Sequence, residues 1–259
     1  MMKRCIIPVL FLCGLFLQPQ FLHAQEAAAA EEQQMQALPQ WLIDFSNLPA
    51  ETRNTYIGKF NLAKEAYQQD RWIDCIALLA ECEIILRGNP NIWNLRACCL
   101  MEQQYFTEAE EEIKRVLEAT PDDEVARMNL AYVYMARGLY KESLAITTRQ
   151  REDLYLMHAE DELLYALDFR ALLCYLLMGQ EDKAHAIATS VTPMTDTPLY
   201  HYAKAAIALV KGNPQAAAYN LNLAKVIFAN NKAYIPYERA LNLSGILKKK
   251  APGQKSATP

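Results

Sequence analysis

The chain has 259 residues, of which 52% are hydrophobic and 22% are charged, with 8 Gly, 12 Pro and 7 Cys. This composition is typical of a globular protein of one or two domains, and it excludes collagen-like, disordered and disulfide-scaffold classes. The net charge is −4, and the only formal charges in residues 1–24 are basic, so the rest of the chain is more acidic still. We therefore expect no nucleic acid among the partners.

Residues 1–24 predict a cleaved export signal. Two basic residues precede a mostly apolar run, 5–17, that is too short to span a bilayer as a helix. Ala24 then supplies the small side chain that a signal peptidase prefers before its cut. Lipidation at Cys13 is the alternative, but a bulky residue precedes this cysteine. We expect a periplasmic, cell-surface or secreted protein with no integral membrane anchor after signal cleavage.

Three further segments follow the signal. Residues 25–37 are rich in Ala, Glu and Gln and predict a flexible spacer. Residues 38–249 are expected to form a helical repeat domain, because 38–48 already contains large apolar side chains that must pack. Residues 250–259 predict a disordered basic tail.

A repeat of about 34 residues organises the helical region. From about residue 56, apolar residues recur at spacings of three and four, which predicts an all-α fold. Five short linkers align at intervals of 34, 34, 41 and 33 residues: Asp70, Gln104, Gly138, Gly179 and Gly212. A small residue follows each linker by five positions: Cys75, Ala109, Ser143, Ala184 and Ala217. A mostly small one precedes each by seven: Ala63, Ala97, Ala131, Leu172 and Ala205. Small residues at these points allow two antiparallel helices to pack closely.

The second and third units carry the clearest motif. The second has Trp93, Ala97, Leu100, Phe106, Ala109, Ile113, Val116 and Pro121, and the third has Leu130, Ala131, Tyr134, Gly138, Tyr140 and Ser143. With this spacing, roughly residues 56–229 resemble the tetratricopeptide repeat (TPR) family. The resemblance implies a right-handed superhelical solenoid of about five helix-turn-helix units. We expect Lys232–Lys249 to form a capping helix that covers the last apolar face.

One interval is longer than the others. The step of 41 residues adds about two helical turns near Gln150 to Glu162. The sequence therefore predicts lengthened helices in the third and fourth units, with a bend or protrusion there.

No catalytic, metal or cofactor site is predicted. The three histidines that follow the signal, His158, His185 and His201, have no zinc-type spacing, and there is no phosphate loop or nucleophile elbow. We therefore expect a protein that is not an enzyme and needs no cofactor.

The five cysteines after the signal are interpreted as structural thiols. Cys75 and Cys82 are seven apart on one helix, which is too far for a disulfide. Cys98 and Cys99 are adjacent, and Cys174 stands alone. A thiol-based redox accessory or enzyme using Cys98, Cys99 or Cys174 is the alternative.

The TPR resemblance also implies a concave groove lined by the first helix of each unit. Its later half is expected to be apolar, aromatic and rich in Met: Met128, Tyr132, Met135, Phe169, Leu173, Leu176, Tyr202 and Leu209. Such a groove suits the helix or extended peptide of a protein partner, which predicts an adaptor in an envelope or cell-surface complex. The alternative is that this stripe is internal packing, filled by residues 38–48 or 232–249. A self-associating structural subunit is a further alternative.

Overall fold

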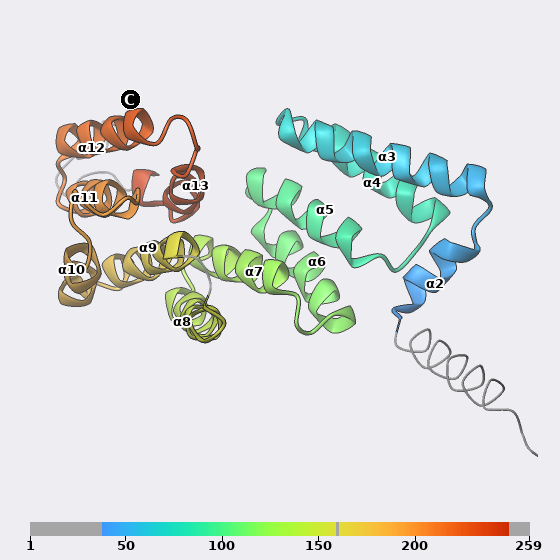
Figure 1. The fold of residues 1–259 in the computed structure, drawn as a ribbon, viewed down its shortest axis with the longest axis horizontal. Helices are drawn as coiled ribbons and strands as arrows, with labels where there is room; N and C mark the ends of the chain where they lie inside the picture. Colours follow the sequence, from blue (N-terminus) through green and yellow to red (C-terminus); the bar gives the residue numbers. More distant parts are fainter. Residues whose placement is uncertain (1–37, 159–160, 249–259) are drawn as a thin grey trace, which may run out of the picture. The chain divides into compact units, whose positions relative to one another are not determined.

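The computed structural model describes residues 38–158 and 161–248. Within these residues, twelve α-helices and one 3-10 helix account for all regular structure (Figure 1). The all-α prediction is confirmed for this part of the chain. The predicted signal (1–24), spacer (25–37) and tail (250–259) lie outside the described residues.

The chain divides into two compact units, residues 1–53 and residues 54–259. The described part of the first unit contains α2 (Gln40–Asn47) and the start of α3 (Ala50–Gln68). Arg53 Nη1 donates to the backbone oxygen of Ser46 at 2.7 Å. This hydrogen bond fixes the turn between α2 and α3.

The second unit is a succession of helix-turn-helix pairs. After α3 comes α4 (Trp72–Ile85), and the next pair is α5 (Pro90–Glu102) with α6 (Phe106–Ala119). The remaining pairs are α7 (Glu124–Ala136) with α8 (Tyr140–Leu156), α9 (Asp161–Leu177) with α10 (Glu181–Thr189), and α11 (Leu199–Val210) with α12 (Pro214–Ile227). From α4 to α12 each helix contacts the next one in the chain. The predicted helix-turn-helix organisation is therefore confirmed.

The five aligned linkers share one backbone conformation. Their φ angles are left-handed: Asp70 58°, Gln104 66°, Gly138 81°, Gly179 72° and Gly212 73°. In each turn the next residue donates its N–H to a carbonyl five positions back, as Leu139 does to Tyr134 at 2.8 Å. This is the Schellman helix ending, which satisfies the last carbonyls of the preceding helix. The alignment made from the sequence thus marks one recurring structural position.

The small residues on either side of each linker are the crossing points of the helices. Nine of the ten aligned positions hold small residues and the tenth is Leu172, and all ten have exposed fractions of 0 or 1%. In the third unit the two positions touch, because Ser143 Oγ donates to the backbone oxygen of Ala131 at 2.7 Å. The small side chains allow this approach, as predicted from their spacing.

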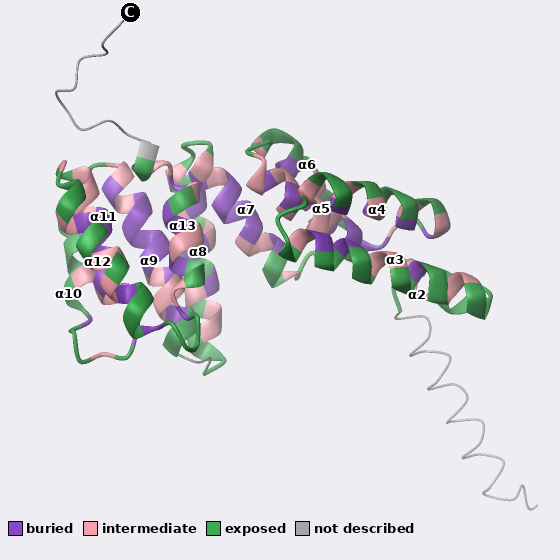
Figure 2. Cartoon of the chain, turned by 90° about the horizontal axis from the view of Figure 1, so that it is seen from above, coloured by how far each residue is buried: buried purple, intermediate pink, exposed green. Residues whose placement is uncertain are grey.

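The long interval lengthens two helices, as predicted. α8 has 17 residues, against 14 in the second helices α4, α6 and α12. α9 also has 17 residues, against 13, 13 and 12 in the first helices α5, α7 and α11. α9 is buried over most of its faces (Figure 2), because α8, α10, α11 and α13 all pack against it. A helix with buried residues on most sides is a core element.

The capping helix is shorter than predicted. α13 spans only Ile235–Leu243, and a 3-10 turn follows at Ile246–Lys248, so the expectation of one helix over 232–249 is wrong. Gly245 has φ 74°, which ends the α-helix at this point. α13 packs against α7, α9 and α11, the first helices of three successive pairs, so it fills their common face and does not serve as the predicted cap over the last pair.

Candidate functional site

An aromatic cluster joins α13 to the helices of the predicted groove. The ring of Tyr237 on α13 lies 5.4 Å from that of Phe169 and 5.5 Å from that of Tyr202. Phe169 and Tyr202 meet edge-on at 5.7 Å. The Tyr237 hydroxyl lies 3.1 Å from Thr197 Oγ1. All three rings are almost fully buried.

Most of the predicted groove is therefore core. Six of its eight residues are buried: Tyr132, Met135, Phe169, Leu173, Leu176 and Tyr202. Met128 and Leu209 are partly buried and pack against the same core. The sequence allowed two interpretations of this stripe, a partner-binding groove and internal packing. The six buried residues are internal packing beneath the segment 232–249. The physical reason is that α13 supplies Tyr237, Ala240 and Leu241, which are buried together with them.

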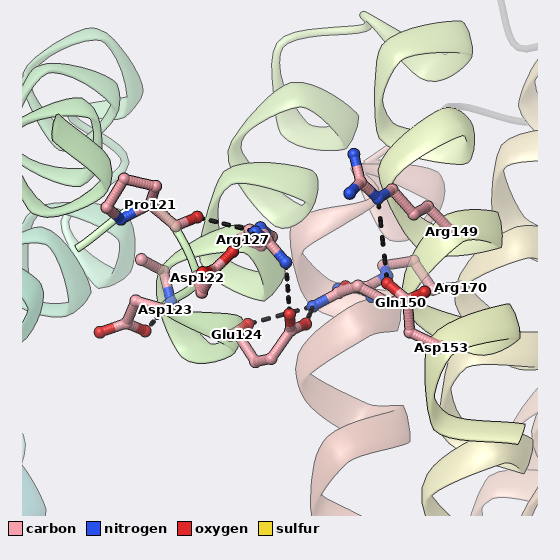
Figure 3. Close-up of polar contacts among 10 residues, drawn as sticks. Pro121, Asp122, Asp123, Glu124, Arg127, Arg149, Gln150, Asp153 and Arg170 are labelled. Carbon is pink, nitrogen blue, oxygen red and sulfur yellow. Dashed lines mark hydrogen bonds and ion pairs between the residues drawn. The ribbon is translucent and has the colours of Figure 1, made fainter. Parts of the chain in front are cut away.

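A buried polar network lies beside this core (Figure 3). Arg170 of α9 has an exposed fraction of 1%, and its two terminal nitrogens donate to the Met128 backbone oxygen at 3.1 Å and to Gln150 Oε1 at 3.0 Å. Gln150 of α8 in turn donates to the Glu124 backbone oxygen at 3.0 Å. The network links α7, α8 and α9 where the long helices replace the standard repeat. The burial of the guanidinium lowers the pKa of Arg170.

Tyr132 lies between two arginines. The guanidinium carbon of Arg170 is 4.7 Å from the centroid of the Tyr132 ring, and that of Arg239 on α13 is 5.7 Å away. Arg239 Nε also lies 3.4 Å from Glu102 Oε1 on α5. Neither arginine was predicted as part of a site. The only signal for Arg170 in the sequence is that it is the one charged residue in the apolar run 169–177.

Part of the concave face remains open beside α13. A pocket of about 440 Å³ lies between α7, α9 and α13. Its walls are mainly apolar, formed by Met128, Tyr132, Leu163, Ala166, Leu167, Ala233, Ile235, Pro236 and Tyr237, and two charged residues, Glu162 and Arg239, complete the lining. Leu163 is 42% exposed and Ile235 is 49% exposed, so both present apolar surface to solvent. Two predicted groove residues, Met128 and Tyr132, thus line a real opening. Leu163 and Ile235 could not be predicted, because they lie outside the aligned repeat positions.

The cysteines are unpaired and mostly buried. Cys75, Cys82, Cys99 and Cys174 are buried, and Cys98 is half-buried. Burial raises the pKa of Cys82 to about 11 and raises the pKa of Cys98 and of Cys174. The contact between the Cys99 and Cys75 thiols, together with burial, raises the pKa of Cys99, and the same contact lowers the pKa of the buried Cys75. A raised pKa keeps a thiol protonated, and the thiolate is the reactive form. These observations give no support to a redox role for Cys98, Cys99 or Cys174.

The described residues, 38–158 and 161–248, contain neither a candidate metal site nor a membrane span. No group of His, Cys, Asp and Glu side chains among them is arranged to hold a metal ion. None of the helices in these ranges is both long and apolar enough to cross a membrane.

The arrangement of the helices is that of TPR proteins. The chain is similar to a thermophilic TPR protein from Thermus thermophilus, with 20% identity and a TM-score of 0.51, covering 72% of this chain and 99% of that one. It is also similar to a tetratricopeptide repeat protein from Parabacteroides merdae, with 20% identity and a TM-score of 0.52, covering 74% of this chain and 70% of that one. No protein-family model and no curated protein matches the chain. The likeness therefore establishes a TPR-like helical repeat fold.

Proposed function

We propose that this protein is an exported scaffold that binds a protein partner as an adaptor in an envelope or cell-surface complex. The observation that carries the binding role is the open apolar pocket between α7, α9 and α13. Exposed apolar surface around a concave opening is typical of sites for the side chains of a partner. Leu163 and Ile235 offer such surface at the rim.

The partner is a helix or extended peptide that inserts an apolar side chain into the pocket. TPR-like repeats are consistent with this role, since a stack of helix pairs presents an extended surface. We therefore assign partner binding to the pocket that α13 leaves open, and not to the buried aromatic cluster. Tyr132 and Met128 form its floor on the α7 side.

The binding role is tested with one charged variant and a matched control. Leu163→Asp places a carboxylate at the rim of the pocket, which opposes the entry of an apolar side chain. Ile84→Asp is the control, because Ile84 is 83% exposed on α4 and does not line the pocket. Helicity and melting are compared first, so that all proteins used are folded. Each protein is then immobilised and used to capture partners from an envelope extract.

We expect wild type and Ile84→Asp to retain the same protein and Leu163→Asp to lose it. Retention of one identical set by all three would contradict the proposal. So would the absence of any protein retained by wild type. Sedimentation of wild type over a range of concentrations separates partner binding from the alternative of self-association.

The exported location is part of the proposal and rests on residues 1–24. Cellular fractionation followed by mass spectrometry tests it. We expect a species beginning at Gln25 outside the cytoplasm, and a variant lacking 1–24 inside it. Continued export of that variant would exclude this signal.

A further inference from the structure

α10 ends early, and this creates an opening on a different side of the repeat stack. It has nine residues, whereas the corresponding helices α4, α6 and α12 have 14. Near its end Thr189 Oγ1 donates to the His185 backbone oxygen at 2.9 Å, and Ser190 Oγ donates to the Ile187 backbone oxygen at 2.8 Å. Such side-chain bonds compete with the helix, and Pro193 prevents its continuation. An irregular segment, 190–198, then leads to α11.

This shortened helix leaves a pocket of about 580 Å³ between α10, the irregular segment and α11. Val191 at its base is buried, and Ala188, Ile207 and Ala208 are partly buried walls. The interior is therefore mostly apolar. A volume of this size falls within the range of about 300–1,000 Å³ that is usual for small-molecule sites.

The rim of the pocket is basic. Lys204 on α11 and Lys211, the residue that caps the end of this helix, are seven positions apart and both line the pocket. His185 lies across from them on α10, and none of the described residues that line the pocket is acidic. A pocket lining with two lysines and no acidic residue is unusual in a chain with a net charge of −4. Cations around a low-dielectric cavity attract anions into it.

Lys204 is held over the pocket by Tyr200. Its Nζ donates to the Tyr200 hydroxyl at 2.5 Å and lies 4.4 Å from the centroid of that ring. Tyr200 itself lines the pocket. The ammonium group is therefore positioned by a neighbouring aromatic side chain and does not extend freely into solvent.

We propose that this pocket binds a small organic anion with an apolar body, a carboxylate amphiphile. The apolar body occupies the space against Val191 and Ile207, and the carboxylate lies at the rim between Lys204 and Lys211. The site is separate from the opening beside α13, since the two pockets have no lining residue in common. The inference therefore does not depend on the protein-binding role.

Titration calorimetry of the full chain with decanoate tests the proposal. Acetate supplies the same charge without the apolar body, and decyltrimethylammonium supplies the same chain with the opposite charge. We expect decanoate to bind with a Kd at least about tenfold lower than either control, a difference of about 1.4 kcal/mol. Binding of decyltrimethylammonium as tight as that of decanoate would overturn the proposal, and so would the absence of measurable binding of decanoate.

Four variants test whether decanoate binds in this pocket. Lys204→Gln and Lys211→Gln each remove one exposed charge, and we expect each to weaken decanoate binding about tenfold. Ala188→Phe fills the cavity without changing its charge and is expected to abolish binding. Lys141→Gln is the control, since Lys141 is exposed on α8 and does not line this pocket. If decanoate bound equally to wild type and to all four variants, the assignment to this pocket would be wrong.

Discussion

The ring of Tyr237 on α13 lies 5.4 Å from the ring of Phe169 on α9, and both side chains are buried. The contact joins the last α-helix to α9, the helix against which α8, α10 and α11 also pack. It fills much of the later half of the predicted groove, for which the sequence allowed both an open binding surface and internal packing, and leaves the pocket beside Leu163 open.

Removal of the Tyr237 side chain should therefore unfold much more than α13. We expect Tyr237→Ala to lower the free energy of unfolding by about 3–5 kcal/mol, the usual cost of deleting a large buried aromatic group. Tyr219→Ala is the control, because Tyr219 is 68% exposed on α12. Urea denaturation followed by circular dichroism measures both. A loss below about 1 kcal/mol for Tyr237→Ala would show that α13 contributes little to the core.

The two buried tyrosine hydroxyls differ in their partners. The Tyr237 hydroxyl bonds to Thr197, whereas the Tyr202 hydroxyl is buried without a hydrogen-bond partner among the described residues. We expect Tyr237→Phe to cost about 1 kcal/mol and Tyr202→Phe to be neutral or stabilising. Chemical denaturation of the two variants side by side is the measurement. Equal losses would contradict this assignment of hydrogen bonds.

The left-handed linkers predict opposite effects at Gln104 and Gly138. Gln104 has a left-handed φ of 66°. This conformation costs about 1–2 kcal/mol for a residue with a side chain, so we expect Gln104→Gly to stabilise the protein by part of that amount. Gly138→Ala should destabilise it by about 1 kcal/mol. A Cβ at Gly138 would meet only Tyr140, at 3.8 Å, so this cost is conformational and not steric. Thermal melting is the check, and a shift of the same sign for both variants would refute the argument.

His201 makes the stability of the protein depend on pH. Its exposed fraction is 7%, and burial lowers the pKa of its imidazole. The folded state favours the neutral form of His201. The contribution of this residue to stability is therefore present above its unfolded-state pKa of about 6.5, and it is lost as the pH falls below that value. We expect His201→Gln to reduce this acid-side loss, measured as unfolding free energy between about pH 7 and 5. An equal acid-side loss in wild type and His201→Gln would contradict this role of His201.

The sequence determined the repeat itself. The linkers recur every 34 residues because each is set by local backbone geometry. The small residues lie at fixed distances from them because two adjacent helices must approach closely. Asp70 and Gln104 show the strength of this signal, because the alignment placed them with three glycines and the structure gives all five the same left-handed backbone. The longer helices α8 and α9 followed from a count of residues in the same way.

Only the tertiary structure decided which apolar stripe is surface and which is core. Whether Phe169 and Tyr202 face a partner or the chain's own last helix depends on where residues about 35–70 positions later return, which no local pattern encodes. The opening beside Leu163 is likewise a gap that remains after α13 has packed against the distant helices α7 and α9. The basic pocket has a more local origin, because it lies between the consecutive helices α10 and α11 where α10 ends early. Periodicity fixes the face of each helix that is apolar, but the partner of that face is set by the packing of the whole chain.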